Sequence, residues 1–403
     1  MQNDPASPRP FRVNIPPSEV ERMKRLIADT RLPDSPPVDG MTWDYGVDLQ
    51  WLKSLRDKWL FDFDWTVVEE KMNAFPHFTA TIEGVNMHFM HQMSSRPDAI
   101  PLLMLHGWPG SFWEFHKIIP LLTEPPADQP AFHIVAPSLT GFGFSSAPPR
   151  KEWSMEDNAR VFDYLMTGVL GYSSYMAEAG DWGALISLNL GSDKYPACKA
   201  LEFTGCPASP TLGAILTTPL FLLPTSWRKW VYSKIYSEDE LFDFARTGQF
   251  WKNGSAYFIQ QMTRPLTIGY AINDSPIGIL AWIGDKYHDL VDPEILPEAT
   301  DFILTTVSLY YLTQTFMSST LPYAENTGSF KQRKTMSKPI GYSRFPYDVN
   351  NAPASWVRAQ HSKLIFARNH QRGGHFPAYE VPDVVAEDIR ALASSQMSLF
   401  SQT

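Results

Sequence analysis

The segment Ala179-Gly180-Asp181-Trp182-Gly183 decides the fold of this chain, because it places one charged residue among small residues at a predicted strand-to-helix turn. The apolar run Tyr175–Ala179 predicts a buried strand before it, and small residues after it predict the start of a helix. Glycines on both sides let the backbones approach closely and lift the central side chain clear of the sheet. Many enzymes hold a serine at this centre. An aspartate, with an ordinary pKa of about 3.9, is already ionised at neutral pH and can attack a saturated carbon without a base.

Asp181 alone also fits an ordinary helix N-cap, which aspartate favours, so other motifs must decide between the two interpretations. The motif His106-Gly107-Trp108-Pro109-Gly110 follows the short apolar run Leu102–Leu105. Its first glycine allows a sharp turn and its proline fixes the next dihedral, which leaves the Trp108 amide facing a cleft. Together with the Trp182 amide, it supplies two donors for an oxyanion. The alternative is a tight turn with a packed tryptophan.

A histidine and a second aspartate complete the set. His375 lies in Arg372-Gly373-Gly374-His375-Phe376, after an apolar run near the C-terminus, and Asp348 ends the motif Phe345-Pro346-Tyr347-Asp348. The alternatives are a solvated loop carboxylate for Asp348 and a surface or core histidine, as we expect for His361 and His370. The chain order of nucleophile, acid and base is that of the α/β-hydrolase fold. The four motifs together favour this fold.

The remaining apolar runs predict a mostly parallel central sheet flanked by helices. Each continuous run is followed by a loop and a helical pattern, which is typical of an α/β sheet with its functional loops at the carboxyl ends of the strands. A hairpin across Glu83-Gly84 precedes these runs. The predicted strands cover residues 77–82, 85–91, 102–105, 132–136, 175–179, 338–342 and 363–367.

Helical patterns predict two additions to this core. Aromatic-rich helical segments lie between the fifth predicted strand (175–179) and the sixth (338–342), and they indicate an inserted helical cap. Near the N-terminus, a capping box at Ser18-Glu19-Val20-Glu21 predicts a helix over residues 18–29, and a second helix is expected over 48–60. These two helices have too few apolar positions to close a core alone. The expected domains are an N-terminal helical flank (1–75), the core in two parts (76–206 and 338–403) and the cap (207–337).

Length, charge and cysteine content exclude several classes of protein. At 403 residues the chain exceeds the roughly 250–300 residues that a single core supports. A net charge of −9 argues against nucleic acid and anionic membranes as partners. Cys198 and Cys206 predict reduced, buried thiols rather than a disulfide framework, and no Cys-His cluster indicates a metal. Because residues 1–10 are polar and proline-rich, we expect neither a signal peptide nor an anchor there, and the longest apolar stretch, 212–223, is interrupted. We therefore expect a cytoplasmic protein, with a secreted protein without disulfides as the alternative.

Five ordered motifs resemble those of the microsomal-type epoxide hydrolases, over about residues 11–389. The N-terminal helical flank belongs to the same branch of that family. We expect no counterpart of the membrane anchor of the animal enzymes, so the chain resembles the soluble microbial relatives more. The motifs are His106-Gly-Trp-Pro-Gly-Ser-Phe-Trp-Glu-Phe115, Gly180-Asp-Trp-Gly183, Asn273-Asp-Ser-Pro-Ile-Gly278, Phe345-Pro-Tyr-Asp348 and Arg372-Gly-Gly-His-Phe376.

The resemblance implies hydrolysis of an epoxide to a vicinal diol by a hydrolase that acts on ether bonds and needs no metal or organic cofactor. Asp181 forms a covalent hydroxyalkyl ester, and His375, oriented by Asp348, activates the water that cleaves it. The Trp108 and Trp182 amides form the oxyanion hole. The implied partners are a small-molecule epoxide and water, and analogy suggests a homodimer.

Tyr257 and Tyr323 match the tyrosines of that family that polarise the epoxide oxygen. A phenol with a pKa of about 10 stays protonated at neutral pH and can donate to a developing alkoxide. Two other functions stay open: a haloalkane dehalogenase with the same aspartate nucleophile and Trp182 as a halide donor, and a non-catalytic ligand-binding protein on the same fold. Substrate identity, enantioselectivity and regioselectivity cannot be deduced from the sequence.

Overall fold

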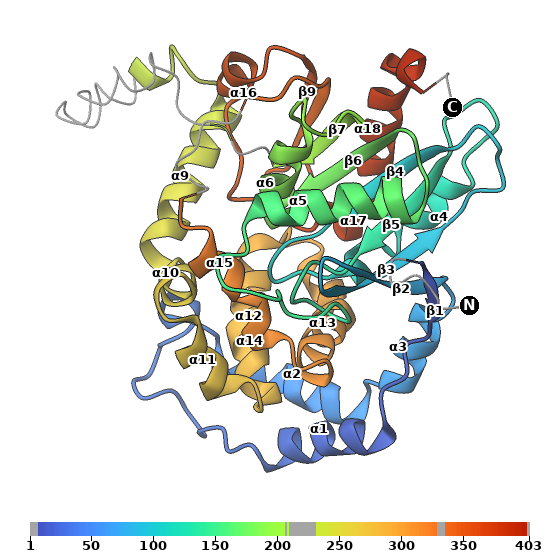
Figure 1. Cartoon of the computed structure of the whole chain (residues 1–403). Helices are drawn as coiled ribbons and strands as arrows, with labels where there is room; N and C mark the ends of the chain where they lie inside the picture. Colours follow the sequence, from blue (N-terminus) through green and yellow to red (C-terminus); the bar gives the residue numbers. More distant parts are fainter. Residues whose placement is uncertain (1–6, 206–207, 209–230, 329–334, 401–403) are drawn as a thin grey trace.

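The computed structural model describes residues 7–205, 208, 231–328 and 335–400. Within these residues the chain forms a nine-stranded sheet in the order β1-β2-β3-β5-β4-β6-β7-β8-β9 (Figure 1). Neighbours from β1 to β5 pair antiparallel, and neighbours from β5 to β9 pair parallel. The predicted mostly parallel sheet is therefore confirmed. The strands are β1 (Arg9–Phe11), β2 (His77–Ile82), β3 (Val85–Gln92), β4 (Ile100–Leu105), β5 (Phe132–Pro137), β6 (Tyr175–Gly180), β7 (Cys198–Thr204), β8 (Ile340–Arg344) and β9 (Leu364–Asn369).

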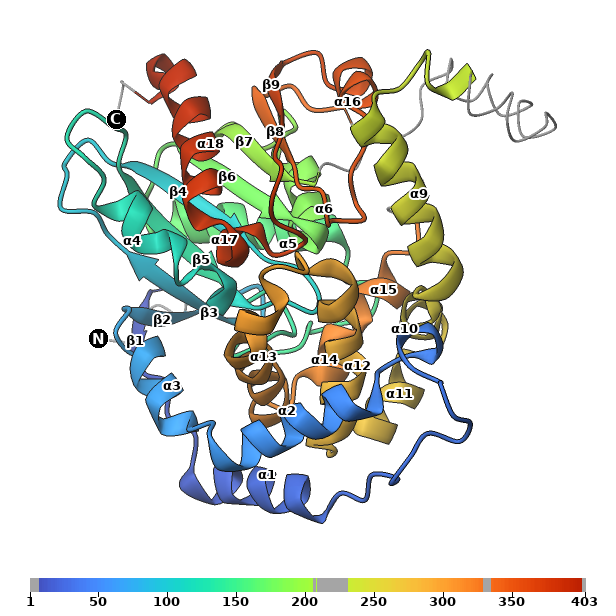
Figure 2. The ribbon, with the colours of Figure 1, turned by 180° about the vertical axis from the view of Figure 1, so that it is seen from behind.

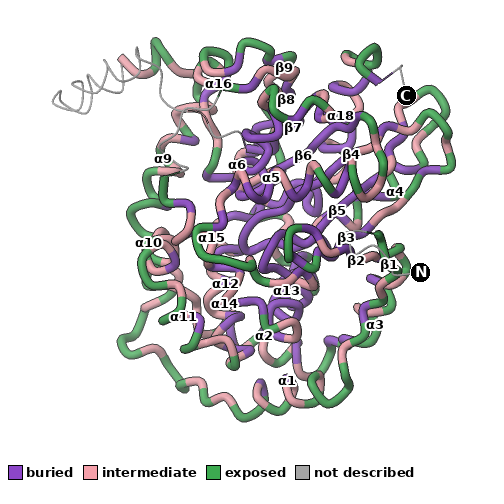
Figure 3. The backbone as a smooth tube through the Cα atoms, viewed as in Figure 1, coloured by how far each residue is buried: buried purple, intermediate pink, exposed green. Residues whose placement is uncertain are grey.

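Helices cover both faces of the sheet. On one face lie α5 (Met155–Tyr164) and α6 (Asp181–Leu190), and on the other lie α4 (Ile118–Thr123) and α18 (Pro382–Ser395), as the two opposite views show (Figures 1 and 2). Strands buried on both faces need apolar side chains at every position, which explains the continuous apolar run that ends β4. The burial map accordingly shows purple along the central strands (Figure 3).

A group of helices lies between β7 and β8 in the sequence. These helices gather beyond one end of the sheet, beside the loops that carry the predicted site (Figure 2). They are α9 (Glu238–Asn253), α10 (Ala256–Thr263), α11 (Pro265–Ile272), α12 (Pro276–Leu290), α13 (Thr300–Leu312), α14 (Phe316–Ser319) and α15 (Leu321–Glu325). The short helices α16 (Ala354–Gln360) and α17 (Pro377–Glu380) belong to the chain after β8.

The N-terminal helices pack on this helical group rather than on the sheet. The helices α1 (Pro17–Asp29) and α2 (Leu49–Phe61) both contact α12 and α13, and α3 (Trp65–Met72) contacts α13. Trp59 of α2 donates its indole N–H to the Ser308 hydroxyl of α13 at 3.0 Å. The flank therefore closes its apolar face against the helices after β7, which is consistent with its inability to form a core of its own.

The predicted capping box at Ser18 is wrong. Helix α1 begins one residue earlier, with Pro16 as N-cap and Pro17 in its first turn, and no side chain caps it. Proline suits this position because its fixed φ is helical and its missing N–H would have no helical partner. The second helix is confirmed, with Asp48 as its N-cap accepting from the Trp51 N–H at 2.8 Å.

Two strands were not predicted. Strand β1 has only three residues, and β7 carries Lys199 and Glu202 within its run, so neither gives a clear apolar pattern. Cys198 in β7 is a buried free thiol, as predicted, and burial raises its pKa to about 12. Residues 1–6 and 212–223 and Cys206 lie outside the described residues. No helix within the described ranges has the length and apolar character needed to cross a membrane.

Candidate active site

Asp181 is the first residue of α6 and lies on a sharp turn directly after β6. Its φ of +46° is in the left-handed region, which is unusual for a residue with a side chain. The turn needs glycine at position 183, because a Cβ there would lie 2.2 Å from the Leu105 carbonyl oxygen of β4. Gly180 is the N-cap of α6, so the interpretation of Asp181 as an ordinary N-cap is wrong. The turn presents the Asp181 carboxylate to the neighbouring loops.

Two backbone amides bind the Asp181 carboxylate. The Trp108 N–H donates to Asp181 Oδ1 at 2.8 Å, and the Trp182 backbone also hydrogen-bonds this carboxylate. A Cβ at Gly107 would lie 2.2 Å from Asp181 Oδ1, so the close approach depends on this glycine. His106 is fully buried and accepts a hydrogen bond from the Leu139 N–H at 3.1 Å. This bond holds the start of the loop that carries Gly107 and Trp108. The sequence-predicted pair of donors and the predicted nucleophile thus meet at one point.

His375 lies between the two aspartates. Its Nδ1 is 2.8 Å from Asp348 Oδ1, and its Nε2 is 3.7 Å from Asp181 Oδ2. The Asp348 carboxylate also accepts from the backbone amides of Val349 and Asn350 at 2.7 and 3.2 Å, which fixes its orientation. The structure therefore brings together the three residues that chain order suggested as a triad.

The pKa values of this group reflect burial and mutual charge. Burial alone would lower the pKa of His375, but the charge and hydrogen bond of Asp348, together with the charge of Asp181, outweigh it and raise the pKa to about 9. Burial raises the pKa of Asp181, while the charge of His375 and the two backbone amides oppose this effect. The raised pKa of His375 therefore favours a protonated imidazole beside Asp181 at neutral pH.

The loop that carries His375 is held by residues that sequence reasoning missed. Glu380 accepts from the Phe376 and Asp292 backbone N–H groups at 2.9 and 2.8 Å, and Asp292 accepts from the Gly373 N–H at 2.8 Å. Gly373 has a φ of +95°, and a Cβ at Gly374 would lie 2.2 Å from a backbone carbonyl oxygen. The glycine pair is therefore required by geometry, whereas no local pattern marked the two acids as buried supports.

The two predicted tyrosines face the site from the helices between β7 and β8. Tyr257 lies in α10 and Tyr323 lies in α15, and their hydroxyl groups hydrogen-bond each other. The Trp108 ring stacks on Tyr257 with centroids 5.1 Å apart and meets Tyr323 edge-on at 5.8 Å. Burial raises the pKa of both phenols above the ordinary value, so both stay protonated over the physiological range.

The nucleophile, the histidine, the two tyrosines and the two tryptophans line one cavity of about 160 Å³. Among its lining residues only Asp181 and His375 carry an acidic or basic side chain, and the remainder is mainly apolar and aromatic, which fits an apolar small-molecule ligand. Within the described ranges no group of three or more His, Cys, Asp or Glu side chains is placed to hold a metal ion. The cavity lining comprises Trp108, Asp181, Trp182, Ala184, Leu185, Gly205, Phe250, Trp251, Tyr257, Phe258, Leu290, Tyr323, Val349, Asn350 and His375.

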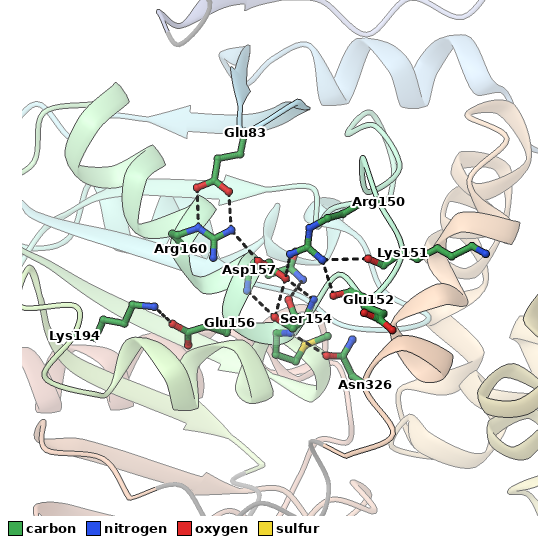
Figure 4. Close-up of polar contacts among 12 residues, drawn as sticks. Glu83, Arg150, Lys151, Glu152, Ser154, Glu156, Asp157, Arg160, Lys194 and Asn326 are labelled. Atoms are coloured by element: carbon green, nitrogen blue, oxygen red, sulfur yellow. Dashed lines mark hydrogen bonds and ion pairs between the residues drawn. The ribbon is translucent and has the colours of Figure 1, made fainter.

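Helix α15, which carries Tyr323, is anchored to the start of α5. Asn326 accepts from the Met155 N–H at 2.9 Å and donates to the Trp153 carbonyl at 3.2 Å. Ser154, the N-cap of α5, forms a capping box with Asp157, and Figure 4 shows Asn326 below Ser154. The position of this tyrosine is thus tied to the sheet-covering helix.

The start of α5 is itself fixed by charge. Asp157 forms ion pairs with Arg150 and Arg160, both at 2.8 Å, and Arg160 also binds Glu83 in the β2–β3 turn at 2.6 Å (Figure 4). Because Asp157 is nearly buried, its ion pairs are less screened than those of an exposed pair. The network links a surface hairpin to the end of the helical group.

Comparison with known proteins identifies the family. Residues 8–115 match the family described as epoxide hydrolase N terminus, and residues 100–243 match the alpha/beta hydrolase fold. Epoxide hydrolase 1 of Sus scrofa is 35% identical over 95% of this chain and 87% of its own length, and epoxide hydrolase 1 of Oryctolagus cuniculus is 33% identical over 94% and 87%. The solved structure of Aspergillus niger epoxide hydrolase has a TM-score of 0.84 at 36% identity and covers 96% of each chain. The chain therefore belongs to the epoxide hydrolase family and has the α/β-hydrolase fold.

Proposed function

We propose that this protein hydrolyses epoxides to vicinal diols, as a hydrolase that acts on ether bonds. The proposal rests above all on one observation: a half-buried carboxylate on a strand-to-helix turn and two protonated phenols share a single, mainly apolar cavity. A nucleophile and two proton donors in this arrangement suit the opening of a strained three-membered ether. Membership of the epoxide hydrolase family supports the same reaction.

In the first step Asp181 Oδ2 attacks a ring carbon, because Oδ1 is held by the Trp108 amide. A new carbon–oxygen bond forms between enzyme and substrate, and the ring carbon–oxygen bond breaks with its electron pair left on oxygen. That oxygen takes a proton from Tyr257 or Tyr323, which keep their protons until this moment. The product is a hydroxyalkyl ester on Asp181.

Loss of the Asp181 charge then prepares the base. In the resting site this charge helps to raise the pKa of His375, and esterification removes it. The proton of His375 passes to the phenolate formed in the first step, which restores the tyrosine and leaves a neutral imidazole.

In the second step His375 takes a proton from water while the water oxygen bonds to the ester carbonyl carbon of Asp181. The oxyanion lies between the Trp108 and Trp182 amides, and loss of one such donor raises a barrier by about 3–4 kcal/mol. When this intermediate collapses, the bond between the carbonyl carbon and the substrate oxygen breaks and that oxygen takes the proton of the newly added hydroxyl group. This releases the diol, restores the carboxylate and leaves His375 protonated, as in the resting site. Asp348 stabilises the imidazolium that forms, since its carboxylate lies 2.8 Å from Nδ1.

Two variants test the proposal on a panel of aryl and alkyl epoxides. Asp181→Asn should form no adduct, whereas His375→Gln should form the ester and hold it, as the mass of the intact protein will show. The proposal is wrong if the native protein turns over none of the epoxides or if His375→Gln stays unmodified. Chloride release from haloalkanes, without diol formation from epoxides, would favour a dehalogenase instead.

We also propose that the enzyme acts in the cytoplasm as a homodimer, with epoxide and water as its only partners. Light scattering on the purified protein tests the assembly, and a particle with the mass of a single chain would exclude the dimer.

A further inference from the structure

A second, much smaller cavity adjoins the same pair of residues. Its volume is about 10 Å³, which is close to the space needed by one water molecule. Asp181 and His375 line it on one side, and Glu114, Glu178 and Thr204 are among its other walls. These walls come from the sheet, its loops and α17. The helices between β7 and β8 instead contribute six residues to the larger cavity and none to the second: Phe250, Trp251, Tyr257, Phe258, Leu290 and Tyr323. The two cavities therefore approach Asp181 from different sides.

The geometry of the Asp181–His375 pair also indicates room for a water molecule. The distance of 3.7 Å between His375 Nε2 and Asp181 Oδ2 is too long for a direct hydrogen bond. Polar atoms at such a separation are commonly bridged by water. A water at this point would lie next to both the base and the carbon that it must attack.

The buried Glu178 and the half-buried Glu114 each have one inaccessible carboxyl oxygen that the fold leaves unsatisfied. Glu178 of β6 is 2% exposed, and its Oε1 accepts from the Thr204 hydroxyl at 3.3 Å. Neither Glu178 Oε2 nor Glu114 Oε2 is accessible to solvent, and neither has a hydrogen-bond partner within the described ranges. Burying a polar atom without a partner is costly, so packing alone does not explain two such atoms beside one cavity.

We propose that Glu114 and Glu178 hold, in this second cavity, the water that hydrolyses the Asp181 ester. This inference rests on the function proposed above. The water donates one hydrogen to His375 Nε2 and the other to a glutamate oxygen, which directs its lone pair at the ester carbonyl carbon. During attack the first hydrogen passes to His375 as a proton, and the water oxygen forms the bond to carbon. The alkyl group of the ester, in the larger cavity, leaves this approach open.

The protonation states suit this role. Burial raises the pKa of Glu178 to about 8 and raises that of Glu114 well above its ordinary value, with the charge of Glu178 adding to the effect on Glu114. A neutral carboxyl group offers one hydroxyl donor and one carbonyl acceptor. The raised pKa values favour this neutral form, in which the glutamates orient water without adding negative charge beside the nucleophile.

The test separates the two chemical steps in single-turnover experiments. Glu114→Met and Glu178→Met remove the hydrogen-bonding atoms at similar volume, so ester hydrolysis should slow at least tenfold while ester formation stays within about twofold of the native rate. Glu114→Gln and Glu178→Gln keep an acceptor and a donor and should recover most of the hydrolysis rate. Equal slowing of both steps, or native hydrolysis in both methionine variants, would overturn the inference.

Glu202 provides a matched control. It lies beside Glu178 in register on β7, is fully buried, has an unpartnered Oε2 within the described part of the chain and does not line the second cavity. Glu202→Met should therefore hydrolyse the ester at the native rate. A slowing as large as that of Glu178→Met would assign the effect to the loss of a buried acid in general.

A second measurement leaves both glutamates unchanged. A crystal structure of the ester trapped in His375→Gln should show one water within hydrogen-bond distance of Glu114 and Glu178. A water bound only on the side of the larger cavity would contradict the inference. If no ester forms in either the native protein or His375→Gln, the proposed function itself fails, whereas an ester that forms and is hydrolysed normally in the methionine variants refutes only the water site.

Discussion

Replacing Asp348 by asparagine keeps the shape and one hydrogen-bond acceptor beside His375 but removes a negative charge. The two side chains are only 4–5% exposed and lie 2.8 Å apart, so solvent screens this charge weakly. The difference between an ordinary histidine pKa of 6.5 and the value of about 9 corresponds to about 3 kcal/mol at 1.36 kcal/mol per pH unit. Asp181 supplies part of this stabilisation and is neutral in the ester, so about 2–3 kcal/mol depends on Asp348.

Ester hydrolysis creates the imidazolium that Asp348 stabilises, so Asp348→Asn should slow this step by about two orders of magnitude. Ester formation should change only a few-fold, and the ester should accumulate. Rapid quenching followed by intact-protein mass measurement gives both rates in one single-turnover experiment. An unchanged hydrolysis rate, or an equal loss in both steps, would refute the assignment of Asp348 as the partner of the base.

The same substitution should change how stability depends on pH. Because the folded pKa of His375 is raised, its contribution to the free energy of unfolding is fully present below about pH 6.5 and is lost as the pH rises through about 9. Denaturant unfolding across this window should show the loss in the native protein and a smaller one in Asp348→Asn.

Five further substitutions follow from contacts in the structure. Gly107→Ala should abolish activity, because its Cβ would lie 2.2 Å from Oδ1 and 2.4 Å from Cβ of Asp181 and would displace the nucleophile. Gly183→Ala should lower the melting temperature more than Gly107→Ala, because its Cβ meets a backbone carbonyl oxygen at 2.2 Å. Thermal melts beside ester-formation rates distinguish the two. Tyr257→Phe and Tyr323→Phe should each slow ester formation at least tenfold and leave hydrolysis of the ester nearly unchanged in single-turnover rates; the reverse pattern would contradict their role as donors. Arg344→Met should lower the free energy of unfolding by about 3 kcal/mol, because it leaves a buried carboxylate of α9 unpaired; a change below 1 kcal/mol in urea unfolding would contradict this estimate.

The sheet was largely predictable because strands that are buried on both faces have continuous apolar runs in the sequence. Leu102–Leu105 is completely buried and was recognised, whereas Glu202 broke the pattern of β7 although it is equally buried. A buried acid is invisible to hydrophobic patterning. The start of α1 failed for a different reason: Ser18 matched a capping pattern, but Pro17 provides the first turn without any cap.

The site was predictable where local motifs encode it. The backbone geometry requires the glycines around Asp181 and before His375, and these glycines mark both positions in the sequence. The order of the motifs along the chain then identified Asp348 as the partner of His375. Tyr257 and Tyr323 came only from the resemblance, because nothing local distinguishes them among 16 tyrosines.

The supporting acids are defined by distant contacts. Glu380, for example, binds a backbone amide 88 positions away. Glu178 did leave one signal, since it is the only charged residue in the run Tyr175–Gly180.

The most direct test of the covalent mechanism follows the oxygen of water. Native enzyme in excess of epoxide is allowed a single turnover in ¹⁸O-labelled water, and both the diol and the peptide that contains Asp181 are analysed by mass. Attack by the carboxylate predicts an unlabelled diol and one heavy oxygen in the Asp181 side chain. A labelled diol from this first turnover, with an unlabelled peptide, would mean that water opened the ring directly and would contradict the account.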